Sequence, residues 1–150
     1  MTDGRGSEGD VDVHGEIGRD TGTFALRYAP VLRPLMAAFG MGPARSTAEI
    51  APEHLRVRVG WAFRATIPLQ NVRHAERAVR PLILGWGVHG WGGRWSVNGS
   101  AKGIVRIDLD QPVRVAVTGI PVRLRTLWVA LADPDAFLAV LGRARVAGQR

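Results

Sequence analysis

The sequence predicts a mainly β fold of the α+β class: a small antiparallel barrel closed by one C-terminal helix, with a short helix near residues 31–39. Two observations predict it. From residue 23 onward, short segments carry an apolar residue at every second position, a period typical of half-buried strands. The last of these segments runs into Asp133-Pro134-Asp135, which is typical of a helix start. Small barrels closed in this way are more often binding modules than enzymes.

Length and composition indicate one domain. The chain has 150 residues, and residues 1–22 are acidic and glycine-rich with few apolar side chains. We therefore expect a disordered tail over residues 1–22, a single domain over residues 23–143 and a C-terminal tail over residues 144–150. The absence of cysteine excludes disulfides and thiolate metal sites. No secretory signal and no apolar run of roughly 20 residues is visible, so we expect a cytoplasmic protein.

The formal net charge of +7 is unevenly distributed. Residues 1–20 hold six acids and two arginines, about −4, so the rest of the chain carries about +11. Such a balance is typical of proteins that bind nucleic acid or an anionic membrane. However, only Lys102 among the 20 basic residues is lysine, and a GC-rich genome also favours arginine. A functional basic surface and ordinary solvated arginines therefore both stay open.

The first half of the chain reads as strands around one short helix. We expect strands over residues 23–28 and 46–50, with a further strand or turn-rich edge over residues 69–78. Apolar residues in 31–39 recur at helical spacing, and we expect this helix to pack on the sheet, with contact to a membrane as the alternative. Residues 55–67 alternate for too long to form one strand, so we expect a hairpin near Gly60.

The second half predicts further strands and the closing helix. We expect strands over residues 104–109 and 113–118, joined by a turn at Asp110-Gln111-Pro112. The apolar face then changes parity between Leu124 and Leu127, which predicts a bulge near Arg125-Thr126. In the helix, Asp133 suits the N-cap, Pro134 the first position and Asp135 the positive end of the dipole. The face expected to dock on the barrel comprises Phe137, Leu138, Val140 and Leu141.

Three stretches carry a family resemblance. The run Leu55-Arg56-Val57-Arg58-Val59-Gly60, then Ile67-Pro68-Leu69, resembles an "L-x-V-x-x-G … I-P-L" hairpin, and Asp133-Pro134-Asp135-Ala136-Phe137 resembles a "D-P-x-x-F" helix start. Both are features of bacterial pleckstrin-homology-like (PH-like) domains. The glycine- and tryptophan-rich residues 85–95 are similar to actinobacterial proteins of this type, whose function is uncharacterised. The resemblance covers residues 23–143 and implies a PH-like barrel with a binding role, without an agreed ligand or catalytic residues.

One departure limits what the resemblance implies. PH domains that bind phosphoinositides carry a K-x-n-[KR]-x-R signature across the first hairpin. Here that hairpin offers Arg56, Arg58 and Arg64 but no lysine, so phosphoinositide recognition is not implied.

The glycine-rich loop around residue 90 is the best binding candidate. Gly85, Gly87 and Gly90 formally match G-x-G-x-x-G, but the residues that follow cannot begin a helix, as a dinucleotide site requires. Indole rings on a glycine-rich loop instead suggest a contact surface with aromatic anchors. The candidate binding residues are Trp86, His89, Trp91 and Arg94, together with Arg56 and Arg58 of the hairpin. We expect Trp95 in the core, and leave Trp91 open between core and contact surface.

The remaining polar residues do not predict a reaction. Asn98-Gly99 is typical of a hairpin turn, and we expect Asp108 to be solvent-exposed. The histidines show no metal-ligand spacing, and no Ser-His-Asp arrangement can be recognised. We therefore expect no catalytic residue, metal or cofactor.

These observations favour a non-catalytic binding module that engages a protein partner or a membrane surface. The alternative is electrostatic binding of nucleic acid, which requires the strand arginines to share one face. These arginines are Arg56, Arg58, Arg106, Arg114, Arg123 and Arg125. The sequence does not indicate an oligomeric state.

Overall fold

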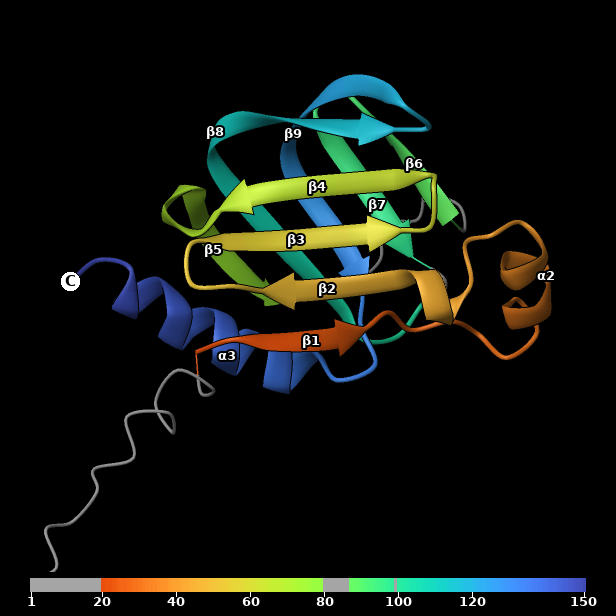
Figure 1. Ribbon diagram of the computed structural model, residues 1–150, viewed down its shortest axis with the longest axis horizontal. Coiled ribbons are helices and arrows are strands. Elements are labelled where there is room, and N and C mark those ends of the chain that lie inside the picture. Colours follow the sequence, from red (N-terminus) through yellow and green to blue (C-terminus); the bar gives the residue numbers. More distant parts are fainter. Residues whose placement is uncertain (1–19, 80–86, 99) are drawn as a thin grey trace, which may run out of the picture.

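The computed structural model describes residues 20–79, 87–98 and 100–150. Within them, two α-helices and nine strands form (Figure 1). The helices are α2 (Arg33–Ala38) and α3 (Pro134–Ala147), and short 3-10 turns lie at η1 (Pro43–Arg45) and η2 (Leu69–Asn71). The strands are β1 (Gly22–Ala25), β2 (Ser46–Ile50), β3 (His54–Val59), β4 (Phe63–Pro68), β5 (Val72–Arg77), β6 (Gly87–Trp91), β7 (Arg94–Asn98), β8 (Ile104–Val117) and β9 (Ile120–Ala130).

The strands form one mixed sheet. Its order is β1-β2-β3-β4-β8-β9-β7-β6, and β5 pairs with β8 beside this path. All neighbours are antiparallel except β7 and β9, which run parallel. In Figure 1, β1 to β4 form a front layer, and β8 and β9 curve over the top into a back layer. A single bridge links Leu26, just after β1, to Leu131, just after β9. The described strands confirm the mainly β, α+β class, but they do not close into a barrel.

Most of the first-half strands form where alternation predicts them, although β1 ends at Ala25 instead of Tyr28 and the edge strand β5 begins only at Val72, after η2. β2 covers residues 46–50 as expected, and β3 and β4 form the hairpin around Gly60. Along both hairpin strands every second side chain is buried, because a strand points successive side chains to opposite faces. Gly60 adopts a φ of 47°, a conformation that glycine reaches without strain.

The turn expected at Asp110-Gln111-Pro112 is wrong, because β8 runs through it from Ile104 to Val117. The pairing with β9 shifts register between Asp108 and Val113, and this shift lets the strand bend instead of reversing. The bent segment bonds to the chain beside it: Asn71 Nδ2 donates to the Gln111 carbonyl at 2.9 Å, and Gln111 N–H donates to Asn71 Oδ1 at 2.8 Å.

The pairing of β8 with β9 is irregular at Arg125-Thr126, where we expected a bulge, but its additional residues lie on β8. Val113 pairs with Leu124, whereas Asp108 pairs with Thr126, so the register shift spans Arg125. Leu124 and Leu127 are both fully buried despite their different parity. Residues 109–112 of β8 span the stretch that on β9 holds Arg125 alone, and β9 faces the core on both sides of this irregularity.

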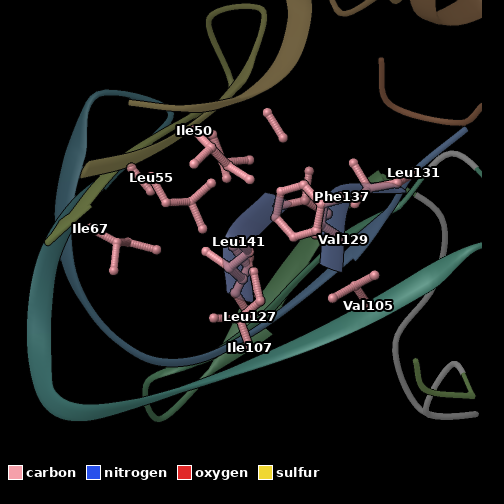
Figure 2. Close-up of a cluster of buried hydrophobic side chains, with 14 of the residues drawn as sticks. Ile50, Leu55, Ile67, Val105, Ile107, Leu127, Val129, Leu131, Phe137 and Leu141 are labelled. Carbon is pink, nitrogen blue, oxygen red and sulfur yellow. The ribbon is translucent and has the colours of Figure 1, made fainter. Parts of the chain in front are cut away.

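Helix α3 covers the open side of the core. Its start is as expected: Asp133 Oδ1 accepts a hydrogen bond from Ala136 N–H at 3.0 Å, and Pro134 opens the helix. Figure 2 shows Phe137 and Leu141 pointing into a cluster of strand side chains. The helix continues to Ala147, past residue 143, where we expected the domain to end, and Ala144 is buried.

Helix α2 does not pack on the sheet, contrary to our expectation. None of its residues is buried, and only Met36 packs against the core. The reason is position: α2 lies beyond the right-hand end of β2 and β3, not over a sheet face (Figure 1). The apolar spacing of residues 31–39 therefore predicts the helix correctly, but the fold leaves most of the apolar face of this helix uncovered.

Two further expectations change at the ends of elements. Asn98-Gly99 does not join a hairpin, because β9 lies between β7 and β8 in the sheet; Gly99 itself lies outside the described residues. The expected tail over residues 1–22 also lies largely outside them, and Gly22 already belongs to β1.

Candidate functional site

The turn between β6 and β7 carries the most exposed tryptophan of the described chain. Trp91 ends β6, pairs with Arg94 at the start of β7, and is 87% exposed. Gly92 and Gly93 form the turn with φ values of 61° and 83°, which favour glycine. The structure thus places Trp91 on the surface. Trp86, the neighbouring candidate, lies outside the described residues.

This turn is attached to β9 at the irregularity. The Gly93 carbonyl accepts hydrogen bonds from Arg125 N–H at 2.6 Å and from Thr126 N–H at 3.1 Å. The irregularity at Arg125-Thr126 therefore has a structural role: it presents two successive N–H groups to the β6–β7 turn. It also brings the exposed Arg125 side chain beside the turn that carries Trp91.

Arg94 is held on a second tryptophan. Its guanidinium carbon lies 5.3 Å from the centroid of the Trp128 ring, and that of Arg106 lies 5.8 Å from the same centroid. Both distances are within cation–π range. Arg106 is also fixed by Asp108, with Nε 3.1 Å from Oδ2.

Asp108 is buried, at 6% exposure, so the expectation of a solvent-exposed acid is wrong. Its carboxylate accepts from Arg106 and, at 3.0 Å, from the Thr126 hydroxyl. These partners explain the burial, because a charged group leaves water only when paired and hydrogen-bonded.

The other residues of this hairpin divide between surface and core. His89 has an exposed side chain and lies opposite Ser96 in the register. Trp95 packs against the core, as expected. Gly90 lies opposite Trp95, and a Cβ at Gly90 would come within 2.7 Å of the Trp95 ring. Glycine at this position therefore makes room for the indole.

The candidate arginines of the β3–β4 hairpin lie elsewhere on the sheet. Arg56 and Arg58 project from the outer face of β3, in the front layer, far along the strand order from β6 and β7. Arg56 lies 3.9 Å from Glu49, whereas Arg58 faces Arg64 across the hairpin. The structure therefore does not bring these candidates together with Trp91.

The strand arginines follow the outer surface as it curves. Arg114 on β8 lies opposite Arg123 on β9. Arg58 belongs to β3, whereas Arg94 belongs to β7 and Arg106 lies opposite Trp128 in the pairing of β8 with β9. The single shared face that the nucleic-acid alternative requires is not formed by the arginines of the described sheet, which are distributed over both layers.

Sequence reasoning missed a second surface at the end of the molecule that carries α2. Five large apolar side chains are exposed there, which we call the apolar end: Val31 (80%), Leu35 (49%), Phe39 (58%), Trp61 (56%) and Ile120 (62%). They come from the α2 segment, the β3–β4 turn and the β8–β9 turn. The helical spacing of residues 31–39 was a signal for part of this surface, but spacing does not reveal whether a face is covered.

Hydrogen bonds hold the three parts of the apolar end together. The Trp61 indole N–H donates to the Phe39 carbonyl at 2.8 Å, which ties the end of α2 to the β3–β4 turn. Thr118 N–H donates to the Ala62 carbonyl at 2.8 Å, which ties the β8–β9 turn to the same place.

A hollow lies at the opposite end, between the β2–β3 turn and the end of α3. It measures about 310 Å³ and is lined by Pro52, Glu53, His54, Gln70 and Arg145, among others. Nowhere in the described residues do three or more metal-ligating side chains gather. None of the described helices is long and apolar enough to cross a membrane.

Comparisons with known proteins identify no relative: no family model matches the chain, and no curated protein and no solved structure does so either. What the chain binds must therefore be inferred from its own residues.

Proposed function

We propose that the protein is a non-catalytic binding module that engages an anionic membrane surface through the arginines on the outer face of its sheet. The observation that carries this proposal is that arginines face one another across neighbouring strands: Arg58 with Arg64, and Arg114 with Arg123. Like charges at opposed positions destabilise a sheet. An anionic surface would relieve this repulsion and gain several contacts at once.

The charge pattern of the described residues supports this proposal. The four opposed arginines form no ion pair with any described carboxylate, whereas Arg56 lies beside Glu49 and Arg106 is bound to Asp108. The opposed pairs are thus among the cations of the described residues that are available for an external anion.

We further propose that the fold is a divergent PH-like one, acting in the cytoplasm. The meander β1 to β4, the long β8–β9 hairpin and the capped helix α3 support the PH-like part. The parallel pairing of β7 with β9 is the departure from it.

A non-catalytic role fits the state of the polar groups. The buried carboxylate of Asp108 is paired with Arg106 and accepts a hydrogen bond from Thr126, which is consistent with a structural role. The hollow between the β2–β3 turn and the end of α3 has three ionisable side chains in its lining, those of Glu53, His54 and Arg145. Catalytic sites usually combine an enclosed pocket with convergent polar groups.

A second candidate is binding of single-stranded nucleic acid. It is favoured by one observation: the exposed Trp91 pairs with Arg94, and the turn between them contacts Arg125 at Gly93. Bases stack on exposed indoles while arginines neutralise phosphates.

Co-sedimentation with phosphatidylserine-containing vesicles, and with phosphatidylcholine vesicles alone, tests the main proposal. We expect binding to the anionic vesicles only, weakening from low to physiological salt because exposed charges are screened. Arg64→Glu should weaken binding, and Arg150→Glu is the matched control because it changes the net charge equally at the far terminus. Equal losses in both variants would contradict a specific basic face.

A separate experiment tests the second candidate, binding of single-stranded nucleic acid. Fluorescence anisotropy with a labelled oligonucleotide should show no binding at physiological salt if the membrane is the partner. Binding that falls with log salt and is lost in Trp91→Ala would instead favour nucleic acid.

A further inference from the structure

We propose that the apolar end enters the interfacial layer of the membrane, so that α2 and the β3–β4 turn form the part that inserts. This inference rests on the proposed function, which by itself requires only electrostatic attachment. It assigns a depth and an orientation: the α2 end faces the bilayer and the end carrying the C-terminus faces away (Figure 1).

The first argument is the clustering of exposed apolar side chains. Eight large hydrophobic side chains are exposed in the described part of the chain, and five of them come from the three hydrogen-bonded segments of the apolar end. Single exposed apolar residues are ordinary, whereas contiguous ones mark an interaction surface. Leu35 and Phe39 are one helical turn apart, so they share a face of the α2 segment.

The second argument is that this surface is preformed. The bond from the Trp61 indole to the Phe39 carbonyl joins helix and turn. At Gly60, the chain approaches the Gly40 carbonyl so closely that a Cβ there would clash with its oxygen. A preformed surface loses little entropy when it binds.

The third argument is the charge around the apolar end, which favours an anionic bilayer as its partner. The segments that build and border this end are residues 29–47, 58–64 and 114–125, and none of them contains Asp or Glu. They contain seven arginines: Arg33, Arg45, Arg58, Arg64, Arg114, Arg123 and Arg125. An anionic bilayer complements both properties, because apolar side chains enter its acyl boundary while arginines meet the headgroups.

The same charges argue against other occupants. A second copy of the chain seated on this end would place arginines against arginines, which opposes association. Nucleic acid would neutralise the arginines but would leave Leu35 and Phe39 in water. Trp61 also suits the bilayer, since indoles are enriched at membrane–water interfaces.

Site-specific labelling tests the insertion, because the chain has no native cysteine. An environment-sensitive fluorophore is attached to Leu35→Cys, and in a second protein to Val146→Cys. Val146 is a matched control, since it is an exposed apolar residue (56%) on helix α3 at the opposite end. On addition of phosphatidylserine-containing vesicles, we expect a blue shift and enhanced emission for the Leu35→Cys label alone.

The outcomes separate the two proposals. If neither labelled protein co-sediments with anionic vesicles at low salt, the proposed function fails and the insertion fails with it. If both co-sediment but the label at position 35 stays in water, attachment is electrostatic only and the insertion is overturned. Equal shifts at positions 35 and 146 would also overturn it, because they exclude the assigned orientation.

A substitution provides an independent measurement. The double variant Leu35→Ser, Phe39→Ser should bind anionic vesicles about tenfold or more weakly, because two side chains no longer bury apolar area. Val146→Ser should bind like the parent. Both side chains of the double variant are exposed, so its urea midpoint should match that of the parent, which excludes unfolding as the cause. A concentration-dependent dimer of the parent in sedimentation velocity, lost in the double variant, would assign the apolar end to self-association instead.

Discussion

Arg58 on β3 and Arg64 on β4 lie directly opposite each other, both exposed, and neither is paired with a carboxylate of the described chain. Two residues earlier on the same strand, at the next position on the outer face, Arg56 has Glu49 as its opposite residue on β2. The outer face of this hairpin thus contains a repulsive pair next to an attractive one. Because the repulsive pair costs stability, it gives the first prediction, in which folding and binding change in opposite directions.

Arg64→Glu should stabilise the fold while it weakens binding to anionic vesicles. The new glutamate faces Arg58, and replacing a like-charge pair by an opposite-charge pair contributes about 0.2–1 kcal/mol. Urea unfolding at low salt measures this gain, and co-sedimentation measures the loss of binding.

Arg56→Glu is the control from the same strand and face. It places a glutamate opposite Glu49, so its effect on stability should have the opposite sign. If both variants lose stability, opposed charge does not explain the hairpin, and the main observation behind the proposed function is lost.

Gly60→Ala should destabilise the protein by more than the backbone conformation alone explains. A left-handed φ at a non-glycine residue costs roughly 1–2 kcal/mol, and the added Cβ would also clash with the Gly40 carbonyl. Gly119 has a φ of 81° with open space around it, so Gly119→Ala isolates the backbone cost. Thermal unfolding of both variants gives the comparison; equal losses would mean that the α2 segment yields to the Cβ.

Alkaline pH should destabilise the protein through Tyr28. Burial raises the pKa of Tyr28 above its ordinary value of about 10, partly offset by a hydrogen bond with Ser46. Its hydroxyl donates to the Met41 carbonyl at 2.8 Å. The unfolded chain therefore loses this proton first, so the contribution is fully present below about pH 10 and is lost as pH rises through the folded pKa.

The test is clean because the chain has one tyrosine and one lysine. Tyrosinate absorbance follows Tyr28 directly, and urea unfolding at increasing pH follows stability. In Tyr28→Phe, stability at neutral pH should fall by about 0.5–1.5 kcal/mol with the lost hydrogen bond, and the alkaline decrease should be smaller than in the parent. An unchanged decrease would assign the alkaline effect to other groups.

Asp108→Asn should cost more than removal of a surface charge. It leaves Arg106 without its buried partner and disturbs the bond from Thr126, at about 1–3 kcal/mol. Glu49→Gln removes the exposed, 3.9 Å pair with Arg56 and should cost at most about 0.5 kcal/mol. Urea unfolding compares the two; similar values would show that burial adds nothing to the Asp108 pair.

Local chemistry was sufficient to predict the elements whose cause lies within a few residues. The cap at Asp133 and the alternation in β3 and β4 depend on neighbouring residues alone, and both are observed. The irregular pairing at Arg125 was also predictable, because a change of apolar parity within one strand allows few other solutions.

Features that depend on distant neighbours were not predictable. Asp110-Gln111-Pro112 reads as a turn, but Asn71, 40 residues away from Gln111, supplies the hydrogen bonds that keep the segment in a strand. The sequence predicts that Asp108 is exposed. In the structure it is buried, because its carboxylate accepts hydrogen bonds from Arg106 and from Thr126 on the neighbouring strand.

The sequence by itself determined the mainly β class, the closing helix and a surplus of arginine outside residues 1–20. Only the tertiary structure decided that Arg58 faces Arg64, and that Leu35 and Phe39 stay uncovered beside Trp61. The physical reason is that alternation and capping are short-range, whereas burial and charge pairing depend on which remote segment lies alongside. For this chain, the candidate binding surfaces depend on burial and charge pairing, and so on the tertiary structure.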